Sequence, residues 1–227
     1  MVGAVVALAA LVAAGAYFFF FMKKLLLFGA LISAGFIAPP AGPYFSGKIV
    51  YHNTFKTLAG EDVSAKLGPM FGLDDPYYIA DNNYKMYTEN KQLVELYTGA
   101  TNQFHFYMNG KEAAALDAAT GTPGTVKMLS QTATVAGYPC QSLEITNEAE
   151  GSSTVFFYAP KLRVNPERFA KHAMGDFYTY LKAASGALPL RMVVTNTKQG
   201  FTMVSEATAV QAMPLTAADF TVDAPAK

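Results

Sequence analysis

The chain has 227 residues, of which 52% are hydrophobic, and its 17 basic and 17 acidic residues give a formal net charge of zero. Because no excess of basic residues provides a surface for a polyanion, we expect no nucleic-acid partner. Cys140 is the only cysteine, which excludes an intramolecular disulfide and a cysteine-based zinc site.

The first 42 residues are typical of an apolar segment followed by a signal peptide. From Met22 the chain continues with two lysines, an apolar run over residues 25–37, and then small and turn-forming residues. The uncharged residues 1–21 would span roughly 30 Å as a helix. Three interpretations of this stretch stay open: a start assigned too early, with Met22 the true first residue; a membrane anchor; or a buried core helix.

This N-terminal pattern predicts an exported protein, located in the periplasm or elsewhere in the cell envelope. If residues 1–21 are retained, the protein is membrane-tethered, and membrane contact is expected through this segment. No lipobox cysteine directly follows the apolar run, so a lipid anchor on a mature N-terminal cysteine is excluded. Residues 43–227 are long enough for one domain with a sizeable core.

Alternation of apolar and polar residues is the strongest signal in this domain, and it indicates strands with one buried face. It is clear at residues 49–56 and again at 103–109, before a predicted Asn109-Gly110 turn. Further strands are expected at residues 77–80, 84–88, 93–98, 113–117, 126–135, 140–146, 154–159, 190–197 and 202–211. Turn residues at short intervals favour an antiparallel meander over βαβ crossovers.

Three short helices are expected. Asn165 is a predicted N-cap, with Pro166 at the first helical position. Residues 176–184 form a second helix with a single apolar stripe, made of Phe177, Tyr180, Leu181 and Ala184. A weaker helix over 61–67 is expected to end at the glycine and proline that follow it. Each apolar stripe needs a partner surface, which the concave face of a curved sheet would provide.

Several short motifs resemble a known group of proteins. TATVAGYPCQSLEI, residues 132–145, resembles the hairpin of the periplasmic lipoprotein-carrier (Lol-type) half-barrel superfamily. TVFFYAPKL, GALPLRMVV and LTAADFTV resemble an uncharacterised secreted bacterial domain family within it. The resemblance covers most of residues 47–222 and contains no catalytic motif. It implies a mainly β (α+β) fold: a curved antiparallel sheet, or open half-barrel, with two or three short helices on its concave side and an apolar cavity between them. Lol carriers hold acyl chains in this cavity, but the sequence shows no recognisable lipoprotein-handling loop.

Residue types with catalytic or metal-binding chemistry are sparse. The three histidines, His52, His105 and His172, belong to no metal-binding or catalytic motif, and no phosphate-binding or dinucleotide-binding pattern is present. The acidic residues near Pro76 are interpreted as a polar connection. Glutamates such as Glu95 occur singly within strands, so pairing them requires knowledge of strand register. We therefore expect no enzyme activity, no metal and no cofactor.

Apolar residues on both faces of some strands point to a cavity as an alternative to an ordinary packed core. Phenylalanine and methionine suit a variable apolar ligand because the thioether chain is flexible. The candidate lining residues are Tyr51, Phe55, Phe104, Phe106, Met108, Phe157, Met192 and Met203. The sequence therefore predicts a non-catalytic protein that binds an apolar ligand, such as a lipid or an acyl chain. The alternative is an envelope interaction or scaffold module with a fully packed interior and no ligand.

Overall fold

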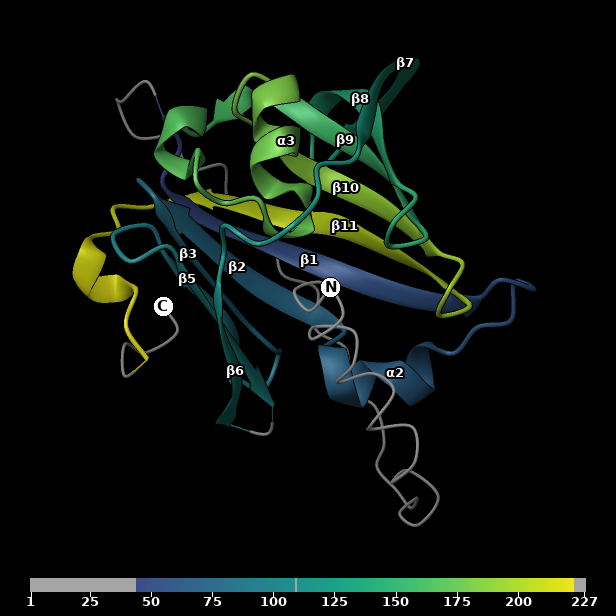
Figure 1. Ribbon diagram of the computed structural model, residues 1–227, viewed down its shortest axis with the longest axis horizontal. Helices are drawn as coiled ribbons and strands as arrows, with labels where there is room; N and C mark the ends of the chain where they lie inside the picture. The colour runs from purple at the N-terminus through teal and green to yellow at the C-terminus, as the bar shows by residue number, and fades with distance from the viewer. Residues whose placement is uncertain (1–43, 109, 223–227) are drawn as a thin grey trace.

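A computed structural model describes residues 44–108 and 110–222, which form one eleven-stranded antiparallel sheet with open edges (Figure 1). The strand order is β6-β5-β4-β3-β2-β1-β11-β10-β9-β8-β7. The strands are Gly47–Thr57 (β1), Asp74–Ala80 (β2), Asn83–Tyr87 (β3), Leu93–Thr98 (β4), Gln103–Met108 (β5), Lys111–Asp117 (β6), Thr125–Val135 (β7), Tyr138–Asn147 (β8), Ser152–Arg163 (β9), Ala187–Asn196 (β10) and Phe201–Ala212 (β11). The open, curved antiparallel sheet predicted from the sequence is confirmed.

The order of the strands divides the sheet into two meanders, β1–β6 and β7–β11, which are joined where β1 pairs with β11. As a result β6 and β7, which follow each other in the chain, lie at opposite edges. Residues 118–124 connect them and pass in front of the sheet in Figure 1. The connection therefore covers part of the face on which the helices also lie.

Strand β1 shows why one face of the sheet is apolar. Ile49, Tyr51 and Phe55 are buried, whereas His52 and Lys56 on the other face are exposed. Successive side chains of a strand point to opposite faces, so this alternation places the first three on the concave side. Burying them supplies the hydrophobic free energy that holds the helices against the sheet.

The hairpin between β7 and β8 follows from its sequence. Val135 pairs with Tyr138, so the loop contains only Ala136 and Gly137. Both have positive φ, at 48° and 80°, as a tight two-residue hairpin requires. Pro139 is the second residue of the returning strand β8. The expected turn before β6 includes Asn109, which lies outside the described residues.

Helices cover the concave face. The short helix α3 (Phe177–Ala183) buries Tyr180 and Leu181 of the predicted stripe, and the Tyr180 ring lies 4.4 Å from that of Phe156 on β9. The 3₁₀ helix η1 (Pro166–Phe169) begins as predicted, because the Asn165 side chain accepts a hydrogen bond from the backbone N–H of Glu167. Two further 3₁₀ turns are η2 (Met174–Asp176) and η3 (Ala217–Asp219).

The predicted end of the helix near residue 67 is wrong. Helix α2 runs from Ser64 to Phe71 and contains Pro69. A proline inside a helix leaves the carbonyl four residues earlier without its donor. Here that carbonyl belongs to Ala65, which is exposed, so water can bond to it. The Phe71 ring lies 5.9 Å from that of Phe55 and anchors α2 to β1.

A smaller apolar cluster lies on the convex face. Tyr78, Tyr87 and Phe220 are buried there, and Lys85 is buried with them. Its Nζ lies 5.4 Å from the centre of the Tyr78 ring and donates a hydrogen bond to the Tyr87 hydroxyl. The cluster leaves the concave face free of this cationic side chain.

In the described part of the chain, no helix has the length and apolar character needed to cross a bilayer. The predicted signal segment, residues 1–42, lies outside the described residues.

Candidate functional site

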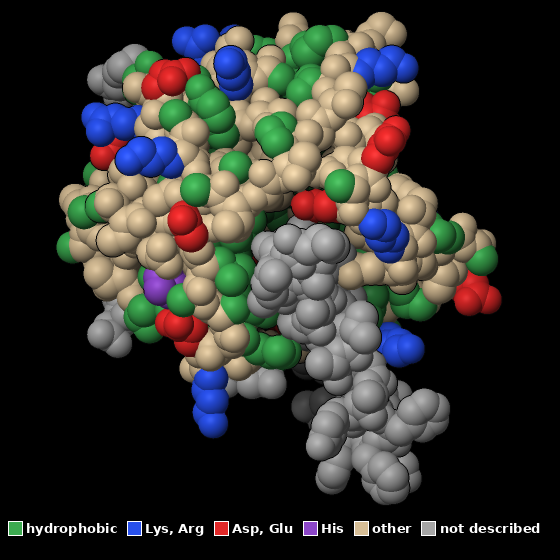
Figure 2. Space-filling model, viewed as in Figure 1, with side chains coloured by type: hydrophobic (Ala, Val, Ile, Leu, Met, Phe, Trp, Pro, Cys, Tyr) green, Lys and Arg blue, Asp and Glu red, His purple; other side chains and the backbone are tan. Residues whose placement is uncertain are grey.

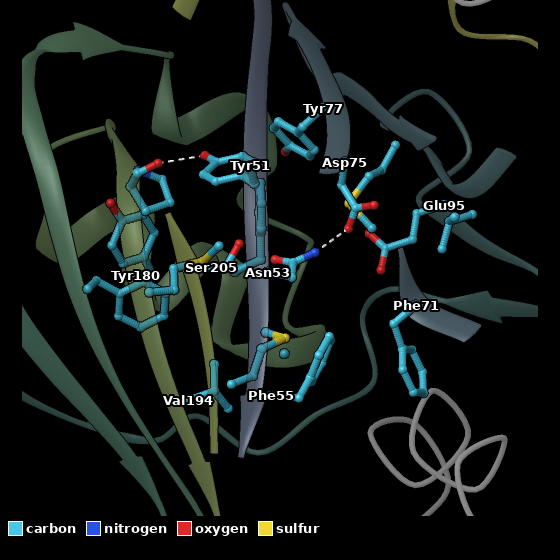
Figure 3. A pocket seen from close by; sticks show the side chains of 18 of the residues that line it. Tyr51, Asn53, Phe55, Phe71, Asp75, Tyr77, Glu95, Tyr180, Val194 and Ser205 are labelled. Atoms are coloured by element: carbon cyan, nitrogen blue, oxygen red, sulfur yellow. Dashed lines mark hydrogen bonds between the residues drawn. The ribbon is translucent and has the colours of Figure 1, made fainter. Parts of the chain in front are cut away.

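A cavity of about 430 Å³ lies between the concave face of the sheet and the helices α2 and α3 (Figure 3). Most of its wall is apolar. The aromatic lining residues are Tyr51, Phe55, Phe71, Tyr77, Phe106, Phe156, Phe177, Tyr180 and Phe201. Aliphatic and thioether side chains complete the apolar wall: Leu67, Met86, Val94, Leu181, Leu188, Pro189, Met192, Val194 and Met203. The volume falls within the range of about 300–1,000 Å³ that is usual for small-molecule sites.

Two of the tyrosines in the aromatic wall, Tyr51 and Tyr180, are held in place by hydrogen bonds from their hydroxyl groups. The Tyr51 hydroxyl donates to the backbone oxygen of Pro189 at 2.6 Å, which links β1 to β10 across β11. The Tyr180 hydroxyl donates to the backbone oxygen of Ala187 at 2.8 Å. These bonds position the rings so that their apolar faces, and not their hydroxyl groups, line the cavity.

The structure places Tyr51, Phe55, Phe106, Met192 and Met203 on the cavity wall. That they contact a ligand stays a prediction. The first two come from β1, whose alternation is unambiguous in the sequence.

Three other candidates, Phe104, Met108 and Phe157, do not line the cavity. Phe104 is buried in the part of the core beside Tyr84, where the two ring centres lie 6.5 Å apart. Met108 packs against the core at the end of β5, where the pairing with β6 shifts register. Phe157 pairs with Arg191, whose guanidinium lies 5.5 Å from the centre of its ring.

Strand register explains why Phe156, and not Phe157, faces the cavity. Phe156 pairs with Met192, another lining residue, whereas Phe157 belongs to the opposite face with Arg191. Because 154–158 has large residues at successive positions, alternation alone does not choose between the two.

Four polar side chains interrupt the apolar wall: Asn53, Asp75, Glu95 and Ser205. Asn53 and Ser205 pair in register on β1 and β11. The Asn53 amide donates a 2.6 Å hydrogen bond to Oδ2 of Asp75, while Oδ1 of Asp75 has no hydrogen-bond partner in the described part of the chain. Figure 3 shows Asp75 and Glu95 pointing toward the same corner of the cavity.

The environment of both carboxyl groups favours their protonated forms. Removal from water raises the pKa of Asp75 to about 8, the hydrogen bond from Asn53 opposes this rise, and the nearby Glu95, Glu89 and Asp74 add to it. Burial raises the pKa of Glu95 to about 7. Both groups therefore change charge near neutral pH.

Sequence reasoning missed this acidic corner. Asp75 is a buried residue of β2, two positions before the cavity residue Tyr77, and does not belong to a polar connection. Asp75 and Tyr77 are two residues apart, and side chains at this spacing on a strand point to the same face. This spacing was the signal in the sequence that could have placed Asp75 on the cavity wall. Glu95 on β4 is brought to the same corner only by the order of strands β1 to β4.

The histidines do not converge on the cavity. His52 Nδ1 lies 2.8 Å from Asp74 Oδ1 on the exposed face, and His105 Nδ1 lies 3.3 Å from Glu112 Oε2. His172 is buried beside Tyr84. Within residues 44–108 and 110–222, no three His, Cys, Asp or Glu side chains are grouped so that they could hold a metal ion.

Cys140 is buried, and its Sγ contacts the backbone oxygen of Tyr138 at 3.4 Å. Burial raises the pKa of this thiol, so the reactive thiolate is disfavoured.

Comparison with known proteins gives likenesses of shape only. No family model and no curated protein sequence matches this chain. Similar solved structures include PNGF-II, with a TM-score of 0.46 and 13% identity over 78% of this chain, which spans 30% of the PNGF-II chain. They also include a LolA superfamily protein from Nitrosomonas europaea, with a TM-score of 0.36 and 11% identity over 79% of this chain and 91% of that one. A third is the MucA/MucB complex of Pseudomonas aeruginosa, with a TM-score of 0.33 and 9% identity over 76% of this chain and 54% of that one. The second belongs to the group that the sequence motifs resemble.

Proposed function

We propose that this is an exported cell-envelope protein, with residues 43–227 as one domain, that binds an apolar ligand such as a lipid or an acyl chain and catalyses no reaction on it. The observation that carries the proposal is the cavity of about 430 Å³ with its aromatic and methionine wall. A folded interior is normally packed to the density of an organic crystal, and few voids exceed the size of a water molecule. A cavity of this volume with an apolar wall is therefore unusual for a packed interior, and an apolar occupant would supply the missing contacts.

The composition of the wall suits a ligand of variable shape. Met86, Met192 and Met203 contribute flexible thioether chains that can follow the outline of an alkyl chain. The rings of Phe156 and Tyr180, packed at 4.4 Å, form a flat and rigid part of the same wall. The rival function, an envelope interaction or scaffold module, would need no such hollow interior.

The test is a pair of substitutions at adjacent valines on β10. Val194 lines the cavity and pairs with Met203, whereas Val193 pairs with Val204 on the opposite face. Val194→Trp fills the cavity, and Val193→Trp adds the same side chain outside it. Binding of the fluorescent apolar probe N-phenyl-1-naphthylamine is titrated with both variants, and native mass spectrometry detects lipid that co-purifies with the wild-type protein.

We expect Val194→Trp to weaken probe binding about 10-fold or more, and Val193→Trp to leave it within about 2-fold. Equal binding by both variants, or an unaltered protein free of lipid that binds no probe, would support the scaffold module instead. N-terminal sequencing of the protein from the envelope fraction tests export. A mature end between residues 36 and 43 supports it, and an intact Met1 supports a tethered form.

A further inference from the structure

The acidic corner, made of Asp75 and Glu95 with the Asn53 amide bonded to Asp75, contains the two carboxyl groups of the cavity wall. Asp75 is 2% exposed, and its Oδ1 has no hydrogen-bond partner in the described part of the chain. A buried polar atom without a partner costs about 1–3 kcal/mol. An oxygen left in this state on the wall of a ligand-sized cavity indicates a partner that arrives with the ligand.

The charges around the corner are all of one sign. Asp74 and Glu89 lie near enough to Asp75 to act on it, and the backbone N–H of Leu73 donates to Oε2 of Glu89 at 3.2 Å. No lysine, arginine or histidine of the described residues lines the cavity. The cationic side chains of neighbouring strands, Lys85 and Arg191, lie on the convex face.

The face of the outer surface drawn in Figure 2 differs from the cavity in this respect, because acidic and basic side chains are mixed on it, without a large patch of one sign. Once ionised, two carboxyl groups in an apolar cavity without a cation repel an anionic group and attract a cationic one, and both effects are stronger there than in water because the effective dielectric constant is lower.

We propose that the cavity selects an amphiphile with a cationic amine head group, whose ammonium pairs with Asp75 and Glu95 while its alkyl chain lies against Met192, Met203 and Phe55. This inference rests on the proposed function and narrows its ligand class. It also argues against fatty acids and phosphate-terminated lipids, because their carboxylate or phosphate would face the carboxyl groups with no cation to accept it.

The hydrogen-bonding capacity of the corner fits an ammonium group, which has three donors and no acceptor. Oδ1 of Asp75 has no hydrogen-bond partner in the described part of the chain and is covered on one side by Gly72, while Oδ2 stays bonded to Asn53. Together with the Glu95 carboxylate on the same cavity wall, Oδ1 supplies the acceptors that the ammonium would use. A neutral alcohol would supply only one donor, and it would leave the charge of the pair unbalanced above neutral pH.

The experiment compares three probes of one chain length: decylammonium, decanol and decanoate. Each is titrated calorimetrically into the full chain at pH values from 6 to 8.5, the two ionic probes below their critical micelle concentrations and decanol below its solubility limit. We expect decylammonium to bind about 10-fold more tightly than decanoate at pH 8. Its affinity should rise with pH, because a cation binds the ionised carboxylates and so must displace their protons at lower pH.

The variants Asp75→Asn and Glu95→Gln keep the shape of each side chain and remove its charge. Each should weaken decylammonium binding about 10-fold and flatten its pH dependence, while decanol binding stays within about 3-fold and shows that the cavity is intact. Asp74→Asn is the matched control, since this adjacent residue is exposed, pairs with His52 outside the cavity, and is the weakest of the three acidic neighbours that act on Asp75. It should change the affinity for decylammonium and for decanol by no more than about 2-fold.

Tighter binding of decanoate, or an amine preference that persists in both carboxyl variants, would overturn this inference while leaving the proposed function in place. If none of the three probes binds, the proposed function fails as well.

Discussion

The hydroxyl group of Tyr84 on β3 lies 2.7 Å from Nε2 of His172, which comes from the segment between η1 and η2. The imidazole ring is 2% exposed and packs among aromatic rings, with its centre 4.4 Å from that of Tyr97 and 4.7 Å from that of Phe177. The contact fixes the helical segment over the first meander. It also places a titratable group where its charged form is disfavoured.

We expect this histidine to destabilise the fold at acid pH. Burial lowers the pKa of His172 from 6.5 to about 4, so the unfolded chain binds a proton between these values and the folded chain does not. The His172 contribution to the free energy of unfolding should therefore fall by roughly 2–3 kcal/mol as pH drops from about 6.5 to about 4, and level off below that.

The contribution is isolated by comparing urea unfolding of the wild type with that of His172→Gln, which cannot titrate, across this pH range. The difference between the two free energies should shrink on acidification. Tyr84→Phe removes the hydroxyl partner and should cost about 1 kcal/mol at pH 7.5. A difference between wild type and His172→Gln that is the same at pH 4.5 and pH 7 would show that this residue does not titrate on unfolding.

The acidic corner gives a pH dependence of opposite sign. Because the pKa of Asp75 is raised to about 8 in the folded protein, the folded state holds a proton that the unfolded state releases above about pH 4. The free energy of unfolding should therefore decline as pH rises from about 4 to about 8. Asp75→Asn removes this term and should stabilise the empty protein at pH 9 by about 1–3 kcal/mol.

Urea unfolding at pH 5 and pH 9 measures this effect. The advantage of Asp75→Asn should be smaller at pH 5 than at pH 9. Asp74→Asn, on the exposed side of the same strand, should stay within about 0.5 kcal/mol of the wild type at both values. An Asp75→Asn protein less stable than wild type at pH 9 would mean that the carboxylate is stabilised in the folded state.

The strands and the concave face were predictable from the sequence because burial of one face imposes alternation. On β1 this pattern identifies Tyr51 and Phe55 without any knowledge of the fold. Where both neighbours are large, as at Phe156 and Phe157, only register decides, and register depends on pairing with β10.

The acidic corner was beyond the reach of local sequence patterns. Asp75 and Glu95 come from β2 and β4, which are separated by β3, and their convergence depends on the curvature of the sheet. The meeting of β1 with β11 is equally non-local, although it joins the two meanders and places Asn53 beside Ser205. Local propensity contains no information on such contacts.

Gly72 bounds the acidic corner on the side of α2. Its φ is +82°, and a Cβ on this residue would overlap Oδ1 of Asp75. Gly72→Ala should therefore cost about 2–4 kcal/mol and displace the carboxyl group. Gly60→Ala is a matched control, because Gly60 has a φ of +90° and nothing within 4 Å of such a Cβ.

We expect Gly60→Ala to cost about 1 kcal/mol, the cost of the backbone conformation alone. The difference between the two variants, measured by urea unfolding, then reports the collision with Asp75 together with the extra backbone strain at Gly72, whose φ of 82° and ψ of 148° are a combination that glycine adopts far more readily than alanine. Equal costs for both would show that the loop after α2 adjusts freely and that Gly72 does not constrain the corner.

Asp176 fixes the crossover between the two edges of the sheet. Its Oδ1 accepts a hydrogen bond from the backbone N–H of Gly124 at 2.6 Å, and its Oδ2 accepts one from the Asn147 side chain at 3.3 Å. The residue has a φ of +60°, which an aspartate adopts at a cost that these bonds offset. Asp176→Gly keeps the backbone conformation accessible and removes both bonds, and we expect it to cost about 2–3 kcal/mol.

The expected structural result is local opening of residues 118–124, because their attachment to the helical segment is weakened. Hydrogen exchange followed by mass spectrometry should show faster exchange in a peptide that covers these residues, with β1 and β11 unchanged. Asp176→Asn retains one carbonyl acceptor for Gly124 and should cost only about 1 kcal/mol, with an intermediate exchange rate. If this peptide exchanges at the wild-type rate in the Asp176→Gly variant, the Asp176 side chain is not needed to hold the crossover. The backbone hydrogen bonds from Ala173 and Met174 to the oxygen of Ala118 would then be sufficient.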